Sequence, residues 1–188
     1  MRTTRSVNHT ESGAHASARL LRMKRVAIVG SGGVGKSTFA DELGRRTDIP
    51  VVHLDQRFWK PGWVETAKEA WVDVQRDIVA EDSWIVDGNY GGTFDVRFAR
   101  ADTVIILTLP RWRCLLRALR RSLRHLGQDI QAPGCRERLD FTFFRWVWRY
   151  PIDSRPRLDA ALGQHREHLA VIELTTVEAV KAFLESVP

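Results

Sequence analysis

The sequence predicts one three-layer α/β domain, in which a doubly wound parallel sheet of about five strands lies between two layers of helices. The main observation behind this prediction is that short apolar runs alternate with helical periodicity along most of the chain. Strands that are separated by helices pair in parallel through right-handed crossovers. The length of 188 residues suits one domain, and contents of 44% hydrophobic and 28% charged residues exclude a fibrous or wholly disordered chain.

The first part of the chain differs from the rest. Residues 1–22 are rich in Ser, Thr, Arg and His, show no apolar period and lack the core of a signal peptide, so we expect a disordered tail. Residues 23–188 are then the folded domain. No run approaches the ~20 apolar residues that span a bilayer, and we expect a cytoplasmic protein with no membrane partner. Cys114 and Cys135 lack disulfide or metal-ligand spacing and favour reduced, structural thiols.

Five short apolar runs predict the buried strands. In chain order they are residues 26–29, 51–54, 84–86, 103–109 and 169–174. The first ends in glycines, the second and third end at Asp55 and Asp87, and the fourth is rich in β-branched residues and closed by Pro110.

Four segments between and after these strands predict helices. Residues 36–46 suit the first helix, and T-x-x-E capping boxes, Thr66 with Glu69 and Thr175 with Glu178, begin the second and the last. The third helix spans residues 111–126, and its larger apolar residues share one face, of the kind that an amphipathic helix normally turns to the core. These residues are Trp112, Leu115, Leu116, Leu119, Leu123 and Leu126.

The residues after the first strand match the phosphate-binding loop G-x-x-x-x-G-K-[ST] in full. They read Gly30-Ser31-Gly32-Gly33-Val34-Gly35-Lys36-Ser37, with Thr38 next. Inward-pointing backbone N–H groups of such a loop bind phosphate oxygens, helped by the N-terminus of the following helix. We therefore expect residues 30–38 to bind ATP, with Lys36 on the β- and γ-phosphates and Ser37 as a ligand of Mg²⁺.

Two aspartates are the candidate acidic groups of this site. Asp55 and Asp87 each follow a predicted strand, which places both at the carboxyl edge of the sheet beside the phosphate loop. Residues 84–87 resemble a Walker B strand, whose carboxylate holds Mg²⁺ directly or through water. Asp55 is then free to act as the base that orients a hydroxyl of the phosphoryl acceptor. The alternative for either aspartate is to cap a helix or a turn.

Five arginines lie opposite the apolar face of the third helix, at positions 113, 117, 120, 121 and 124, and no Asp or Glu occurs between Asp102 and Asp129. Unpaired guanidinium groups suit phosphate binding. We expect at least one of Arg117, Arg121 and Arg124 to contact the transferred phosphoryl group, with Arg117 and Arg121 as the catalytic candidates. A merely solvated face or a nucleic-acid-binding face would show the same pattern.

Residues 127–161 fit the alternating pattern least well, because they mix arginines with aromatic residues, and they suggest a helical excursion packed over the site. Trp59 and Trp63, beyond Asp55, either cover the acceptor or pack internally. His53 lies in an apolar strand, which favours a core histidine with hydrogen-bond partners over a catalytic one.

With these motifs in view, the chain from about residue 23 onward resembles the FlaR-related family, also called DNA topology modulation proteins, among the adenylate kinase-like and shikimate kinase-like P-loop kinases. Beyond the phosphate loop the matching stretches are His53-Leu54-Asp55, Phe58-Trp59-Lys60-Pro61-Gly62-Trp63, Asp87-Gly88-Asn89-Tyr90, Ala101-Asp102-Thr103-Val104-Ile105, Leu109-Pro110-Arg111 and Arg145-Trp146-Val147-Trp148.

The resemblance implies a five-stranded parallel sheet and a mobile, Arg-rich lid over about residues 127–161. Asp87-Gly88 also looks like the dipeptide before the monophosphate-binding turn of adenylate kinases. Asn89-Tyr90 replaces the Phe-Pro-Arg that follows there, which disfavours AMP as the acceptor. Arg97 is left either to bind phosphate in its place or to lie on the surface.

Two functions follow as hypotheses. The first is an ATP- and Mg²⁺-dependent phosphotransferase that acts on a small metabolite such as a nucleoside or nucleotide. The second is a nucleotide-dependent, nucleic-acid-binding regulator of DNA topology, and the net charge of +6 (29 − 23) favours it. The absence of an N-K-x-D sequence argues against a GTPase. Neither the acceptor nor the oligomeric state follows from the sequence.

Overall fold

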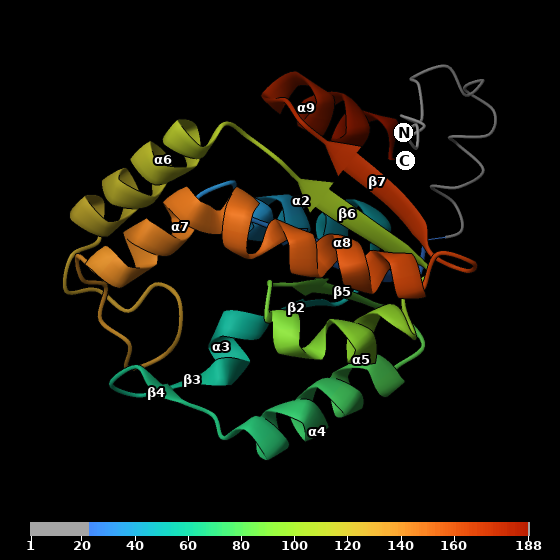
Figure 1. Ribbon diagram of the computed structural model, residues 1–188, viewed down its shortest axis with the longest axis horizontal. Helices are drawn as coiled ribbons and strands as arrows, with labels where there is room; N and C mark the ends of the chain where they lie inside the picture. The colour runs from blue at the N-terminus through green and yellow to red at the C-terminus, as the bar shows by residue number, and fades with distance from the viewer. Residues whose placement is uncertain (1–22, 188) are drawn as a thin grey trace.

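The computed structural model describes residues 23–187, so the predicted tail of residues 1–22 lies outside the described residues. The central sheet has five parallel strands in the order β2-β5-β1-β6-β7. Their bounds are β1 Arg25–Gly30, β2 Val51–His53, β5 Trp84–Asp87, β6 Thr103–Leu107 and β7 Ala170–Leu174. The parallel sheet with helices on both faces confirms the predicted fold class (Figure 1).

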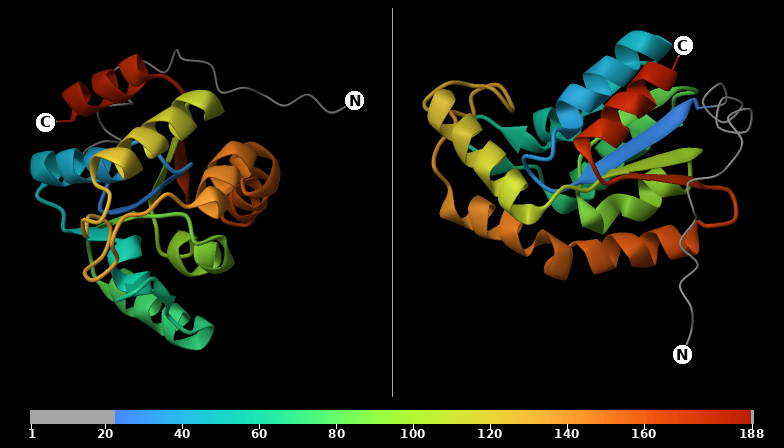
Figure 2. Two further views of the ribbon diagram at one scale, coloured as in Figure 1. Left: turned by 90° about the vertical axis from the view of Figure 1, so that its left-hand side faces the viewer. Right: turned by 90° about the horizontal axis from the view of Figure 1, so that it is seen from above.

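Two helical layers enclose the sheet (Figures 1 and 2). Helices α2 (Lys36–Thr47) and α9 (Val177–Ser186) pack on one face, and α4 (Lys68–Ala80), α5 (Phe94–Phe98) and α8 (Arg155–Gln164) pack on the other. Helices α6 (Arg111–Arg124) and α7 (Phe141–Asp153) lie side by side near the carboxyl ends of the strands. The smaller elements are α3 (Leu54–Phe58), the hairpin of β3 (Trp59–Lys60) and β4 (Val64–Glu65), and a 3-10 turn at Gly91–Thr93.

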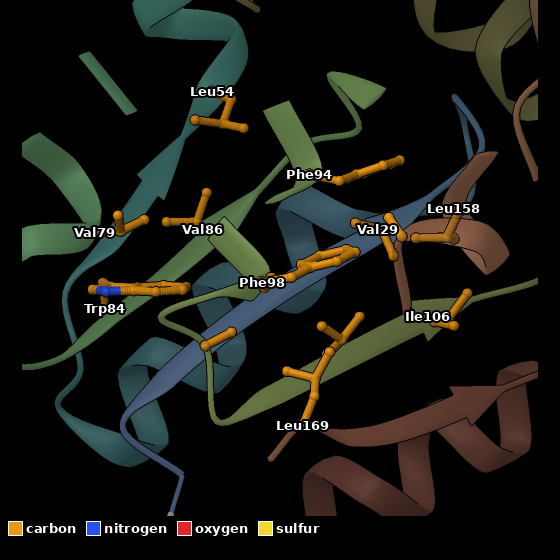
Figure 3. Packing of buried hydrophobic residues seen from close by; sticks show 14 of the residues in the cluster. Val29, Leu54, Val79, Trp84, Val86, Phe94, Phe98, Ile106, Leu158 and Leu169 are labelled. Carbon is orange, nitrogen blue, oxygen red and sulfur yellow. The ribbon is translucent and has the colours of Figure 1, made fainter. Parts of the chain in front are cut away.

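The core divides into two clusters because successive side chains of a strand point to opposite faces of the sheet. In β1, Val26 and Ile28 belong to the cluster under α2 and α9, whereas Ala27 and Val29 belong to the cluster under α4, α5 and α8. Figure 3 shows part of the second cluster, in which Trp84 and Phe98 are 1% and 0% exposed. Full burial of one such large side chain stabilises the fold by about 1.5–3 kcal/mol.

Several predicted element ends are wrong. The second strand ends at His53 and the fourth at Leu107, so Asp55 lies in the first turn of α3. Both predicted capping boxes are wrong. The hydroxyl of Thr66 donates to the Phe58 carbonyl (2.6 Å) and closes the hairpin, and α4 begins after Ala67 instead. The last helix is capped by Thr176, whose Oγ1 accepts from Ala179 N (3.0 Å).

Helix α6 does not turn its predicted apolar face to the core. Its buried residues are Cys114, Ala118 and Ser122, whereas most of the large apolar residues are exposed. The reason is the phosphate loop: a side chain at Gly33 would collide with the Cys114 carbonyl, so only the side of α6 with small residues can approach the loop this closely. The exposed residues are Trp112 (55%), Leu116 (38%), Leu119 (36%), Leu123 (55%) and Leu126 (56%).

The segment of residues 127–161 begins as a loop and ends as helices α7 and α8. The side chain of Asp140 caps α7 by accepting from Thr142 N (2.8 Å) and Phe143 N (3.1 Å). Both cysteines are buried and free, and the Cys135 thiol donates to the Lys60 carbonyl (3.2 Å), which ties this segment to the β3–β4 hairpin. Within residues 23–187 no helix has the length and apolar character needed to cross a bilayer.

Candidate active site

The phosphate loop leaves β1 at Gly30 and enters α2 at Lys36. Gly33 and Gly35 have φ angles of 73° and 103°, in the left-handed region that glycine adopts without strain. Asn89 holds the start of the loop, since Gly30 N donates to Asn89 Oδ1 (3.1 Å) and Asn89 Nδ2 donates to Gly30 O (2.6 Å). The loop therefore has a defined conformation in front of the N-terminus of α2.

The carboxyl edge of the sheet opens into a cavity of about 820 Å³. Six of the nine predicted nucleotide-binding residues line this cavity: Gly32, Gly33, Gly35, Lys36, Ser37 and Thr38. The other three, Gly30, Ser31 and Val34, form the buried base of the loop rather than its cavity side. Lys36 Nζ donates to the Ser31 carbonyl (3.2 Å), which keeps the ammonium group over the loop.

The loop is closely packed between two helices. An ideal Cβ atom on Gly32 would lie 2.8 Å from both Phe143 Cζ and Val147 Cγ2 of α7, and Gly33 meets the backbone of α6 in the same way. The Ser31 hydroxyl also lies 3.5 Å from the Val147 carbonyl. Glycine at position 32 is thus needed for close packing, and α7 covers this part of the phosphate loop.

Ser37 and Asp87 meet at the base of the cavity. Ser37 Oγ donates to Asp87 Oδ2 (2.6 Å), which joins the start of α2 to the end of β5. Asp87 is 5% exposed, and its other oxygen, Oδ1, has no hydrogen-bond partner among the described residues. Burial opposes ionisation of Asp87, but hydrogen bonds from His53 and Ser37 and the charge of Lys36 hold its pKa below the ordinary value.

The residues present fit a magnesium ion. A buried carboxylate oxygen without a partner beside a serine hydroxyl is a donor set that Mg²⁺ accepts, usually completed by water and substrate phosphates. Among residues 23–187 no three His, Cys, Asp or Glu side chains gather to hold a metal by themselves. The pair of Ser37 and Asp87 therefore suits an ion that arrives with a nucleotide.

His53 has hydrogen-bond partners, as predicted, but they are two carboxylates and the ring lies at the cavity rather than in the core. Its Nδ1 lies 3.1 Å from Asp87 Oδ2 and its Nε2 lies 3.0 Å from Asp41 Oδ1, and all three residues line the cavity. Both ring nitrogens must carry a proton to donate to carboxylate oxygens. The hydrogen bond to Asp87 accordingly raises the pKa of His53, although burial opposes this shift.

Asp55 lies on another side of the same cavity, at the start of α3. Its Oδ1 accepts from the Tyr90 hydroxyl (2.6 Å), and both residues line the cavity. Burial and the neighbouring Asp55 raise the pKa of Tyr90, so the phenol keeps its proton and remains a donor. Trp59 and Trp63 also line the cavity, and they contact each other edge to face with ring centroids 5.4 Å apart.

Arg97 occupies neither of its two predicted positions. It is fully buried and donates to three consecutive carbonyls, of Gly88 (2.7 Å), Asn89 and Tyr90 (3.2 Å). The guanidinium group thereby fixes the turn after β5. Through this turn Arg97 positions Asn89 against the phosphate loop and Tyr90 against Asp55. Arg97 itself does not line the cavity.

The structure brings two of the three candidate arginines of α6 to the cavity. Arg117 and Arg121 line it, and Arg117 also approaches the Val34 carbonyl (3.4 Å), whereas Arg124 does not line it. The Arg121 Nη2 atom lies 3.6 Å from the carboxylate of Glu137, which is 4% exposed and accepts a hydrogen bond from Ser122. This buried acid connects residues 127–161 to α6.

Sequence reasoning missed other cavity residues. Arg138 and Arg157 line the cavity, and the sequence shows them only as members of an arginine-rich segment. Asp41 and His53 were missed because their pairing joins α2 to β2. The available signal was the position of His53 at the end of a predicted strand, two residues before Asp55.

No protein-family model matches this chain, and no curated protein matches it. Among solved structures, shikimate kinase from Acinetobacter baumannii in complex with shikimate has 17% sequence identity and a TM-score of 0.54, over 90% of this chain and 93% of that one. A kinase-like protein from Chloroflexus aurantiacus has 14% identity and a TM-score of 0.50, over 87% and 96% of the two chains.

Identities this low show a shared fold, and a fold does not by itself define an activity. The comparisons therefore confirm the predicted fold class, a parallel five-stranded sheet with flanking helices, which this chain shares with a shikimate kinase. The resemblance to the FlaR-related family has no matching family model and stays a prediction from the sequence.

Proposed function

We propose that this protein is an ATP- and Mg²⁺-dependent phosphotransferase that acts on a small metabolite, a nucleoside, nucleotide or similar compound. One observation carries the proposal: the phosphate loop, the hydrogen-bonded pair of Ser37 and Asp87, and Asp55 all line a single cavity. A nucleotide and an acceptor can therefore meet in one cavity. A shikimate kinase whose structure contains shikimate shares this fold, and this likeness supports a small-molecule acceptor.

On the donor side, residues 30–38 bind the triphosphate through backbone N–H groups and the N-terminus of α2. Lys36 contacts the β- and γ-phosphates, and Arg117 and Arg121 approach from α6. Ser37 and Asp87 hold Mg²⁺, which when bound neutralises charge on the phosphate oxygens. His53 keeps Asp87 Oδ2 engaged, so that Oδ1 stays available for the ion or its water.

On the acceptor side, Asp55 takes the proton of the attacking hydroxyl as a general base. The Tyr90 hydroxyl orients the carboxylate by donating to Oδ1, and the other oxygen then faces the acceptor. Trp59 and Trp63 provide an apolar wall for a ring or a base.

Residues 127–161 act as the lid of this site. Phe143 and Val147 of α7 already touch the phosphate loop, and Arg138 and Arg157 add positive charge to the cavity wall. A closed lid excludes water and so suppresses hydrolysis of the triphosphate.

The nucleic-acid-binding alternative is not supported by a specific observation. Two of the helix arginines on which it depends, Arg117 and Arg121, line the same cavity as the phosphate loop, which gives them a role beside a bound nucleotide. The remaining arginines of α6 lie beside exposed leucines of the same helix, and binding to a nucleic-acid phosphate backbone does not require such apolar side chains.

The first test is phosphoryl transfer from labelled ATP to a panel of nucleosides, nucleotides and sugars. The wild-type protein should label one class of acceptor only when Mg²⁺ is present. Lys36→Ala should lower the rate at least about 10²-fold, because it removes a positive group from the developing phosphoryl charge. Transfer that survives this substitution would contradict the mechanism.

Two further variants separate the roles of the residues. Lys60→Ala is the matched control, since Lys60 is an exposed lysine outside the cavity, and its rate should equal that of the wild type. Asp55→Asn should lower kcat by about 10²–10⁴-fold while the affinity for ATP, measured by calorimetry, stays unchanged. A loss of ATP affinity in Asp55→Asn would place Asp55 on the donor side instead.

A further inference from the structure

Helix α6 carries a row of large apolar side chains that the fold leaves in solvent. Trp112, Leu116, Leu119 and Leu123 follow one another at spacings of four and three residues, which places them on one side of the helix, and Leu126 follows in the turn just beyond its end. Each is at least 36% exposed. We call these five residues the α6 stripe. None of them lines the central cavity.

Helix α6 lies on the outside of the domain, so the stripe faces solvent. The helix lies at the periphery of the molecule in Figure 1 and in the right-hand view of Figure 2, with α7 on its inner side. Large apolar side chains that gather on one exposed side of a helix indicate an interaction site, because their contact with water is unfavourable. The buried side of α6 is already occupied by the phosphate loop.

Arginines flank the α6 stripe on one side. Arg113, Arg120 and Arg124 are exposed, and none forms an ion pair with any residue of 23–187, although Glu178 of α9 lies near enough to Arg113 to feel its charge. The sequence from 103 to 128 contains no Asp or Glu. Whatever covers the stripe must therefore offer apolar material and negative charge together.

We propose that the α6 stripe and its arginine flank bind the surface of an anionic lipid membrane. An amphipathic helix with Leu and Trp on one side and arginines beside them lies in the plane of the interface, with its apolar side chains among the acyl chains and its cations at the lipid phosphates. A second copy of α6 would offer the leucines but no acid for the arginines. A nucleic acid would offer phosphates but nothing for the leucines.

The expectation of no membrane partner rests on the absence of an apolar run long enough to span a bilayer, and a helix that lies on the surface of a membrane needs no such run. Membrane binding at the stripe is independent of the proposed phosphotransferase activity. The α6 side chains that line the cavity, Arg117 and Arg121, are neither stripe residues nor among the three flanking arginines Arg113, Arg120 and Arg124.

The test is sedimentation of the full-length protein with vesicles. Vesicles of phosphatidylglycerol and phosphatidylcholine in equal parts should bind the protein, and vesicles of phosphatidylcholine alone should bind it at least about tenfold more weakly. The triple variant Leu116→Gln/Leu119→Gln/Leu123→Gln should lose about tenfold or more in affinity for the anionic vesicles. Arg113→Gln/Arg120→Gln/Arg124→Gln should bind more weakly and lose most of its salt dependence.

The matched control is Val64→Gln/Val177→Gln, which removes aliphatic side chains of similar exposure from other surfaces and should bind like the wild type. Circular dichroism verifies that every variant keeps its helical content. The proposal is overturned if the wild type does not bind the anionic vesicles, or if the leucine variant binds them as tightly as the wild type does. It is also overturned if the leucines instead support a concentration-dependent dimer in sedimentation equilibrium without vesicle binding, or if the arginines support DNA binding that the leucine variant retains.

Discussion

At the scale of single residues, Arg97 illustrates how a side chain can support a site from outside it. It donates to the carbonyls of Gly88, Asn89 and Tyr90, and it is completely buried. A buried guanidinium group without an ion pair is costly unless its donors are satisfied. Here three carbonyls accept from Nη1 and Nη2, whereas Nε has no hydrogen-bond partner among the described residues. The resulting turn places Asn89 and Tyr90 for their contacts with the phosphate loop and with Asp55.

We therefore expect Arg97→Met to destabilise the protein by about 2–4 kcal/mol, because three buried carbonyls lose their donor. The free energy of unfolding should be measured by urea denaturation. Arg57→Met is the control: Arg57 is exposed, and the change should stay within about 0.5 kcal/mol. An Arg97→Met protein as stable as the control would show that water can replace the guanidinium group.

At the scale of elements, α8 is fastened to the sheet by a polar contact. Arg155 at the start of α8 donates to both carboxylate oxygens of Glu173 in β7 (2.6 and 3.0 Å), and Thr108 donates to the same carboxylate (2.8 Å). The hydrogen bond from Arg155 holds the pKa of Glu173 below its ordinary value, although burial opposes this. The contact joins the end of the lid segment to the edge of the sheet.

This contact predicts a pH dependence of stability. Because the pKa of Glu173 is lower in the folded than in the unfolded protein, its contribution is complete above the unfolded value of about 4.3 and disappears as the pH falls through the folded value. Glu173→Gln should cost below about 1 kcal/mol at pH 7, since the pair is partly exposed.

The measurement is the free energy of unfolding of Glu173→Gln and wild type between pH 7 and pH 3. The difference between them should shrink toward the acid end. Glu185→Gln, at an exposed glutamate 3.6 Å from Lys181, is the control and should show little difference at any pH. A gap between Glu173→Gln and wild type that stays constant with pH would assign the effect to packing instead.

At the scale of the whole molecule, the cavity is assembled from segments far apart in the chain. The phosphate loop, the turn after β5, α6 and residues 127–161 all contribute to its lining. A ligand that bridges these segments binds only the folded state, so it stabilises the molecule by mass action.

Saturating Mg²⁺ and ATP should therefore raise the midpoint of thermal unfolding. At about 100 times Kd the gain is about 2.7 kcal/mol, which corresponds to about 5–10 °C for a chain of this size. Differential scanning calorimetry should show this shift for the wild type and for Asp55→Asn, but not for Lys36→Ala. A wild-type midpoint that does not move with ATP would remove the donor half of the proposed site.

The local signals were sufficient for the phosphate loop, the parallel sheet and the placement of Asp87. These follow from short patterns, since a strand, a glycine-rich turn and a helix start are specified by neighbouring residues. Strand and helix ends were less accurate. The hydroxyl of Thr66 was predicted to cap α4 by accepting a hydrogen bond, and instead it donates to the Phe58 carbonyl and closes a hairpin.

The sequence by itself determined that this chain folds as a P-loop α/β domain and which residues form its phosphate loop, because short patterns of neighbouring residues encode the strands, the helices and the glycine-rich turn. Only the tertiary structure decided which side of α6 is buried, where Arg97 goes and what His53 contacts. Periodicity shows that a helix has an apolar side but not which element meets it. Burial of Cys114 and Ala118 against the phosphate loop, and exposure of Leu116 and Leu123, depend on the space between elements that are distant in the chain.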